Sequence, residues 1–296
     1  MKSVPLPQYL LDGRPVASEE AAEHLGSRLA MYGEGCFDTL VSFQGGVLCP
    51  GEHLRRLHDG ISFLGWMVPA PLSHTDAFMD TLGTFLAAND AADQLVRIRI
   101  QVWSDDRTVG YRPGTTPSTR FLITGARMES ATFPPVSLIT SRIRRIPDDA
   151  LPANVKWTNG INYILAAREA QQKGADDALM LTVDGYVSET TAANLFWVDS
   201  GTVFTPSEDC DLLPGITRSI LVEVVRESGI PLRTGRFDPS VLQQADAVWI
   251  CNSVREICPV TRLDDRRYDA GNLILEEVTA GFENLKHGRL QYVQQA

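Results

Sequence analysis

The order of strand-like and helix-like segments restricts the possible folds more than any other feature of the sequence. Residues 96–102 alternate strictly between apolar and polar side chains, which predicts a half-buried strand with Arg97 and Arg99 on one face. Apolar side chains at steps of three and four predict helices over 54–64 and 78–86. Because the strand patterns come in runs and the helices are grouped, without regular βαβ alternation, the order favours an α+β fold.

Similar patterns predict strands, turns and helices along the rest of the chain. Further strand patterns occupy 39–43, 47–48, 121–124, 136–140, 178–183, 194–198 and 247–251. Gly45-Gly46 and Asp184-Gly185 separate strand-like runs and predict tight hairpin turns. Further helices are expected before Lys173, after Pro214-Gly215 and near the end of the chain.

A polar stretch that ends in Pro134-Pro135 is the best candidate for a linker, because consecutive prolines end regular structure. We therefore expect a small N-terminal α+β domain at 1–126, a linker at 127–135 and a larger C-terminal domain at 136–296. The C-terminal domain would carry Lys156.

The charge of the chain excludes several classes of partner. Its 27 basic and 37 acidic residues give 27 − 37 = −10, which argues against nucleic acid and anionic membranes as general partners. The five cysteines are odd in number and widely spaced, so reduced thiols are expected, with neither disulfides nor a metal site. The first residues lack the apolar core of a signal peptide, so a cytoplasmic location is expected.

Lysine is scarce, and one lysine has unusual surroundings. Four of the 27 basic residues are lysines, so 27 − 4 = 23 are arginines. Lys156 lies in an apolar stretch, beside Trp157. Two interpretations stay open on these residues alone: a surface lysine whose stem lies along Trp157, or a lysine that forms a Schiff base.

Common motifs of other enzyme classes are absent from the sequence. There is no GxxxxGK[ST] phosphate loop, no complete dinucleotide fingerprint after Gly33, and no GxSxG segment. His53 and His58 are five residues apart, which does not place two metal ligands on one helix face.

Five segments occur in an order that resembles a known family. They are Tyr32-Gly33-Glu34-Gly35-Cys36-Phe37-Asp38-Thr39, His53-Leu54-Arg55-Arg56-Leu57, Lys156, residues 187–197 and Leu213-Pro214-Gly215-Ile216-Thr217-Arg218. Together they resemble the class IV aminotransferases, the fold-type IV enzymes that use pyridoxal 5'-phosphate (PLP). This family includes branched-chain and D-amino acid aminotransferases and aminodeoxychorismate lyases. The resemblance extends from about Leu11 to Arg266.

The resemblance implies a two-domain enzyme with its active site between the domains, and it gives roles to particular residues. Lys156 would be the Schiff-base lysine and would move the proton at the substrate Cα. Glu189 would pair with the pyridine nitrogen, so that the ring acts as an electron sink. The phosphate would be bound by Arg56, by the helix N-terminus at Ile216 and Thr217, and by a second loop at Asn252 and Ser253.

Each of these cofactor residues also has an ordinary structural interpretation. Glu189 is equally compatible with a solvated hairpin carboxylate, and Arg56 with a surface arginine. The Pro214-Gly215 step and the Asn252-Ser253 pair are equally compatible with plain or capped turns.

The segment after Lys156 departs from the family pattern. Where many members have a tyrosine that contacts the phenolic oxygen of PLP, this chain has Ile161, and the nearest tyrosine is Tyr163. Either Arg144 or Arg145 is a candidate for that contact, and the sequence does not choose between them.

Within the family, the motif sequences are most similar to those of aminodeoxychorismate lyase. That enzyme forms 4-aminobenzoate and pyruvate from 4-amino-4-deoxychorismate in folate biosynthesis. Residues 192–197 and 249–260 resemble that subfamily, and Thr39 lies where lyases carry a proton-delivering hydroxyl. Val109 replaces an arginine common in lyases, so the substrate carboxylate would need Arg97, Arg99, Arg107 or Arg112 instead. Arg97 and Arg99 are preferred because they lie on the same strand face, although solvated strand arginines are an equal alternative, and Tyr32 is a further candidate for binding the substrate.

Two alternatives are kept open. The first is a transaminase that moves an amino group between a D-amino or branched-chain amino acid and a 2-oxo acid, with the same cofactor residues. The second is a PLP-binding protein without activity. In every case the resemblance implies a small anionic amino substrate or ligand and a homodimer.

Overall fold

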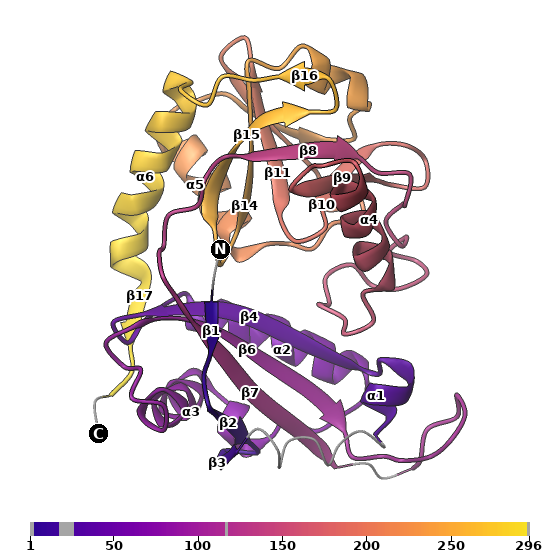
Figure 1. The fold of residues 1–296 in the computed structure, drawn as a ribbon, viewed down its shortest axis with the longest axis vertical. Coiled ribbons are helices and arrows are strands. Elements are labelled where there is room, and N and C mark those ends of the chain that lie inside the picture. The colour runs from indigo at the N-terminus through magenta and orange to yellow at the C-terminus, as the bar shows by residue number, and fades with distance from the viewer. Residues whose placement is uncertain (1–2, 18–26, 116–117, 295–296) are drawn as a thin grey trace. The chain divides into compact units, whose positions relative to one another are not determined.

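The computed structural model describes residues 3–17, 27–115 and 118–294 (Figure 1). Its contacts divide the chain into two units, and each unit is discontinuous in sequence. The first unit comprises Met1–Ala131, Val155–Asn159 and Arg289–Ala296. The second unit comprises Thr132–Asn154 and Gly160–Gly288.

The first unit is built on one sheet whose strands are paired in the order β17-β5-β4-β6-β7-β2-β3, with β1 also on β7. All of these pairings are antiparallel. The strands are β1 (Ser3–Pro5), β2 (Gln8–Leu11), β3 (Arg14–Ala17), β4 (Gly35–Phe43), β5 (Gly46–Leu48), β6 (Leu95–Ser104), β7 (Thr119–Met128) and β17 (Leu290–Tyr292). The helices of this unit are α1 (Arg28–Tyr32), α2 (Pro50–Phe63), the 3₁₀ turn η2 (Ala70–Leu72) and α3 (Thr75–Ala87).

Apolar side chains at alternate positions of the long strands form the core of the first unit. On β6, Ile98 and Ile100 are fully buried and join one apolar cluster with Leu57 of α2 and with Phe78 and Phe85 of α3. Burying each such side chain contributes about 1.5–3 kcal/mol relative to leaving it exposed. The intervening residues of β6 lie on the opposite face of the sheet, as the alternation predicts.

A short segment from the middle of the chain completes the first unit. Trp157 forms an isolated antiparallel bridge with Cys36 at the edge of β4. The backbone N–H of Thr158 donates to the carbonyl oxygen of Gly35 over 2.9 Å. Val155 belongs to the apolar cluster of this unit.

The second unit contains a mixed sheet in the order β10-β9-β8-β15-β14-β11-β12-β13, with β16 on β15. Strand β10 pairs with β11 as well as with β9. Six strands therefore form a closed ring of hydrogen-bonded neighbours, in the order β10-β9-β8-β15-β14-β11. The strands are β8 (Val136–Thr140), β9 (Asp177–Leu181), β10 (Val187–Thr190), β11 (Asn194–Asp199), β12 (Thr202–Pro206), β13 (Leu232–Gly235), β14 (Ala247–Asn252), β15 (Glu256–Leu263) and β16 (Arg266–Arg267).

Apolar side chains from several strands form the core of the second unit. Leu138, Leu179, Leu195, Ile250 and Val260 are fully buried in one cluster. Three helices and a 3₁₀ helix accompany the sheet: α4 (Ile161–Gln172), α5 (Ile216–Glu227), η3 (Pro239–Gln243) and α6 (Leu273–Arg289). The small residues Ala166 and Ala170 of α4 pack on Met180 of β9.

The predicted α+β class is confirmed, and both expected hairpins are present, although the first turn consists of Gln44 and Gly45 because Gly46 already pairs with Phe43 as the first residue of β5. Gly45 and Gly185 both have positive φ angles, +76° and +91°, which glycine adopts without steric cost. One boundary is corrected: residues 127 and 128 belong to β7, because Arg127 pairs with Val96 and Met128 with Ser3. The irregular stretch therefore begins after Met128.

The contact-based division also differs from the expected domains in its treatment of Lys156. We expected this residue in the C-terminal domain, whereas Val155–Asn159 groups with the first unit. The hydrogen bonds and the bridge to β4 are the physical reason for this difference.

Candidate active site

Lys156 is anchored by its backbone to the edge of β4. The backbone N–H of Phe37 donates to the carbonyl oxygen of Lys156 over 2.9 Å. The Nζ atom of Lys156 lies 4.9 Å from the centroid of the Phe37 ring. The side chain of Lys156 is half-buried, and the hydrogen bond to β4 fixes its backbone beside the Phe37 ring. This environment differs from that of a freely solvated surface lysine.

The face of the sheet that carries Phe37 also carries Arg99. Its guanidinium carbon lies 3.4 Å from the ring centroid of Phe37, and its Nη2 donates to Gln101 Oε1 over 2.8 Å. Thr39 is the cross-strand partner of Arg99. Burial and the neighbouring Arg97 lower the pKa of Arg99 to about 10, so Arg99 remains a cation at neutral pH. Arg97 shares this face of the strand, but its side chain is exposed.

Arg56 lies on α2 and binds a buried carboxylate. Its Nη2 donates to Asp38 Oδ1 over 2.7 Å and its Nε donates to Oδ2 over 3.0 Å. His53 Nδ1 lies 3.1 Å from Asp38 Oδ1. Burial raises the pKa of Asp38, but Arg56 and His53 lower it by more, so it lies well below its ordinary value.

Tyr32, a predicted substrate contact, holds a loop of its own unit. Its hydroxyl accepts a hydrogen bond from the backbone N–H of Gly110 over 2.7 Å, and its ring lies 5.7 Å from that of Tyr111. Val109, which replaces the arginine common in lyases, is 81% exposed on the same loop.

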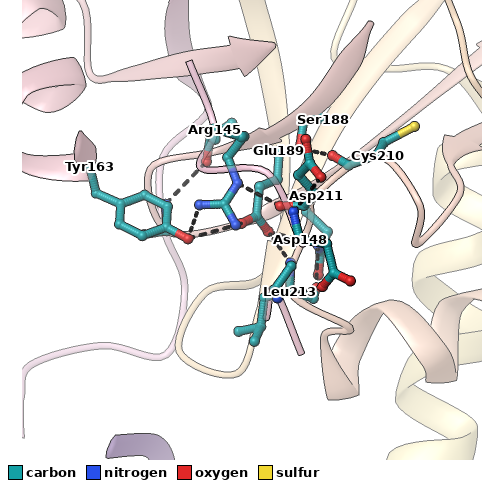
Figure 2. Close-up of polar contacts among 12 residues, drawn as sticks. Arg145, Asp148, Tyr163, Ser188, Glu189, Cys210, Asp211 and Leu213 are labelled. Carbon is teal, nitrogen blue, oxygen red and sulfur yellow. Dashed lines mark hydrogen bonds and ion pairs between the residues drawn. The ribbon is translucent and has the colours of Figure 1, made fainter. Parts of the chain in front are cut away.

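Glu189 lies on β10 within the second unit, and its side chain is almost completely buried. Figure 2 shows its polar contacts. Its Oε2 accepts hydrogen bonds from Asn194 Nδ2 over 3.1 Å and from the backbone N–H of Leu213 over 3.2 Å. Its Oε1 lies 3.3 Å from Arg145 Nη2 and 3.5 Å from the hydroxyl of Tyr163. A solvated hairpin carboxylate, the ordinary interpretation of Glu189, does not fit this environment.

The N-terminus of α5 follows Gly215 directly. Gly215 is the N-cap residue and no described side chain caps the helix, so the N-terminal N–H groups are available to an anion without a competing side-chain acceptor at the cap. A Cβ atom at Gly215 would lie 2.1 Å from Asn194 Oδ1, so the close approach requires glycine. Ile216 and Thr217 are both buried in the first turn.

Asn252 and Ser253 lie where β14 ends, and Asn252 forms a capped turn. Its Oδ1 accepts hydrogen bonds from the backbone N–H groups of Val254, over 2.9 Å, and Arg255, over 2.7 Å. Its Nδ2 donates to the carbonyl oxygen of Ala192 over 3.0 Å. The amide of Asn252 is thus engaged in fixing this turn, while Ser253 is half-buried beside it.

The two arginines that are candidates for contacting the phenolic oxygen of PLP differ in their surroundings. Arg145 is buried and directed at Glu189, whereas Arg144 is exposed. Ile161, in the position of the family's usual tyrosine, is 57% exposed.

Sequence reasoning missed Asp38 and His53 as partners of Arg56, and Asn194 as a partner of Glu189. One available signal was an ionisable residue, Asp38, at an inward-facing position of an alternating strand.

Among the described residues, no group of three or more His, Cys, Asp or Glu side chains is placed to bind a metal ion. In the same part of the chain, no helix has the length and apolar character needed to cross a membrane.

A family model confirms the class to which this fold and these residues point. The model of the amino-transferase class IV family matches residues 35–263, more than half of the chain. The chain therefore belongs to the amino-transferase class IV family, as the motifs predict.

Individual relatives carry two different activities in their names. The chain is 26% identical to the aminodeoxychorismate lyase of Bacillus subtilis over 260 residues, which covers 87% of each chain. It is 28% identical to the branched-chain-amino-acid aminotransferase of Escherichia coli over 263 residues, covering 86% of this chain and 84% of that protein. The crystal structure of an E. coli branched-chain aminotransferase matches with a TM-score of 0.89 at 25% identity, covering 98% of this chain and 100% of that one.

Proposed function

We propose that this chain is a PLP-dependent enzyme that converts 4-amino-4-deoxychorismate to 4-aminobenzoate and pyruvate. Transamination between an amino acid and a 2-oxo acid is the second candidate. The observation that carries the lyase proposal is the shared face of β4 and β6, where Thr39 lies across from Arg99 and beside Phe37. Phe37 is in turn in contact with Lys156 Nζ.

The residues present fit PLP. Glu189 is a buried carboxylate whose described contacts are all hydrogen-bond donors, as expected of an ionised partner for a protonated ring nitrogen. The uncapped N-terminus of α5 fits a phosphate, and Gly215 leaves no room there for a side chain. The family resemblance gives Arg56 a role in binding the phosphate, and within its own unit Asp38 fixes the guanidinium of Arg56.

When bound, PLP supplies an electron sink for the electrons released at the substrate Cα. The residues of this chain would do the rest. Lys156 would hold the cofactor covalently through Nζ until the amine of the substrate displaces it, and the freed Nζ would then accept the Cα proton. Arg99 would bind a carboxylate of the substrate, because it is a cation whose guanidinium lies over the ring of Phe37 and is hydrogen-bonded to Gln101. The hydroxyl of Thr39 would deliver a proton as pyruvate forms.

Two measurements test the cofactor part of the proposal. The purified protein should be yellow, and borohydride should fix PLP covalently on Lys156, identified by peptide mass. Lys156→Ala should abolish both the covalent adduct and the activity. Retention of the absorbance and activity in that variant would contradict the assignment, and a chain that binds no PLP would refute the cofactor proposal outright.

A substrate assay separates the two reactions. The lyase proposal predicts 4-aminobenzoate and pyruvate from aminodeoxychorismate without any 2-oxo acid acceptor. The transaminase is favoured by Val109, since the loop that carries an arginine in many lyases here presents an exposed valine. Turnover that requires both an amino donor and a 2-oxo acid would refute the lyase and support the transaminase. We further expect a cytoplasmic homodimer, which light scattering tests for the oligomeric state.

A further inference from the structure

We propose that Arg145 is a positioning residue that keeps Glu189 ionised and fixed for the ring nitrogen of the cofactor, with Tyr163 as an intermediate hydrogen-bonding partner. This inference rests on the proposed function, because it deepens the role of Glu189. All of the residues involved belong to the second unit, and Figure 2 shows Arg145 and Tyr163 directed at the carboxylate of Glu189.

The guanidinium of Arg145 is fixed on several sides. Its Nε donates to the carbonyl oxygen of Asp211 over 2.7 Å, and its Nη1 donates to the hydroxyl of Tyr163. The backbone N–H of Arg145 donates to the carbonyl oxygen of Leu181 over 2.9 Å. With these anchors the remaining terminal nitrogen, Nη2, lies 3.3 Å from Glu189 Oε1. The side chains of Arg145 and Glu189 are 4% and 6% exposed, so water screens the pair very little.

The hydrogen-bond inventory around Glu189 favours the ionised carboxylate. Asn194 Nδ2, the N–H of Leu213 and the guanidinium of Arg145 can only donate. Burial raises the pKa of Tyr163, and the carboxylate of Glu189 raises it further, so the phenol keeps its proton at neutral pH. Tyr163 can therefore accept from Arg145 and donate its own proton to Glu189.

A buried carboxylate without a cation would be expected to take up a proton, because burial disfavours the charged form. A neutral acid at position 189 would present an O–H group where the cofactor offers an N–H group. Arg145 therefore prepares an acceptor before the cofactor arrives. Removing its charge should weaken cofactor binding through the ring nitrogen alone, without disturbing the phosphate site.

The experiment compares PLP with its 1-deaza analogue, in which a carbon replaces the ring nitrogen. Dissociation constants for both compounds are measured with the apo forms of the wild type, Arg145→Met and Arg145→Lys by quenching of tryptophan fluorescence. The control is Glu169→Gln. Glu169 is another buried carboxylate of the second unit, bonded to Ser141 Oγ over 2.8 Å and to the N–H of Arg142 over 2.9 Å. Chemical unfolding of each apo protein shows how much stability each change removes.

We expect Arg145→Met to weaken PLP binding by about 10–100-fold, the range of one lost hydrogen bond to a charged group. The same variant should bind the deaza analogue as the wild type does. Arg145→Lys, which retains the cation, should recover most of the affinity for PLP. Glu169→Gln should lose stability and keep its affinity for both compounds within about 3-fold, less than the loss of one such hydrogen bond.

An unchanged affinity of Arg145→Met for PLP overturns the inference, and so does an equal loss for both compounds, which would indicate a purely structural role. If Arg145→Met does not fold, Arg145→Lys provides the test. The inference would be overturned if Arg145→Lys lost as much affinity for the deaza analogue as for PLP, each relative to the wild type. A wild-type chain that binds neither compound would instead refute the proposed function.

Discussion

Replacing Asp38 with Asn should destabilise the first unit by about 3 kcal/mol, the lower end of the cost of breaking a buried ion pair by removing one partner. The change keeps the shape of the side chain and removes its charge. Asp38 is 1% exposed and Arg56 is 10% exposed, so the cation left behind is largely shielded from water. Its slight exposure to solvent is the reason for choosing the lower end of the range.

The matched control is Asp12→Asn, the same chemical change in a more exposed pair. Asp12 and its partner Arg120 are 33% and 29% exposed, and an ion pair of that kind contributes about 0–1 kcal/mol. Urea unfolding of both variants and the wild type, followed by tryptophan fluorescence, gives the free energies of unfolding.

The difference between the wild type and Asp38→Asn should also depend on pH. Because the folded-state pKa of Asp38 is lowered from its ordinary value of 3.8, its contribution to stability is present above that pH. The contribution is lost as the pH falls toward the folded-state pKa, so the difference should shrink in acid. A destabilisation below about 1 kcal/mol, the range of exposed pairs, or a difference that grows on acidification, would refute the reasoning.

Two further predictions concern the candidate site. Gly215→Ala should weaken PLP binding by at least about 10-fold, because the new Cβ atom would displace Asn194, whose amide is hydrogen-bonded to Glu189. Fluorescence titration measures the affinity, and an unchanged affinity would contradict the close approach of Gly215 to Asn194. Arg99→Ala should raise KM for the anionic substrate by about 10–100-fold, the effect of one charged hydrogen bond, while Arg97→Ala should change it little, because only Arg99 is held against Phe37. Equal effects of the two changes in steady-state assays would contradict this distinction.

Local patterns predicted most of the elements, because they depend on residues close together in sequence. The alternation of 96–102 places Ile98 and Ile100 in the core and Arg97 on the opposite face, as expected. Gly45 marked the first hairpin because its positive φ angle suits glycine, but the other turn residue is Gln44, at φ +50°, and not Gly46. By contrast, the end of β7 depends on pairing with β1 and β6, so the predicted linker began two residues too early.

The arrangement around the site depended on contacts between distant segments. The partners of Glu189 include Arg145, which precedes it by 44 residues, and no periodicity links the two. The pairing of Arg56 with Asp38 joins a helix to a strand across the core, and its signal was a single carboxylate among apolar neighbours. The family motifs indicated which residues to examine, whereas only the structure gives their partners and their burial.

The pairing of β17 with β5 has a consequence for how the chain acquires its structure during synthesis. Leu290 pairs with Leu48, and the N–H of Cys49 donates to the carbonyl oxygen of Arg289 over 3.2 Å. Contacts that span more than 200 residues form slowly, because the chain loses the entropy of closing the loop before the contact stabilises it. The sheet of the first unit therefore keeps an open edge at β5 until β17 has been synthesised, and a truncation before residue 290 would leave that edge unpaired.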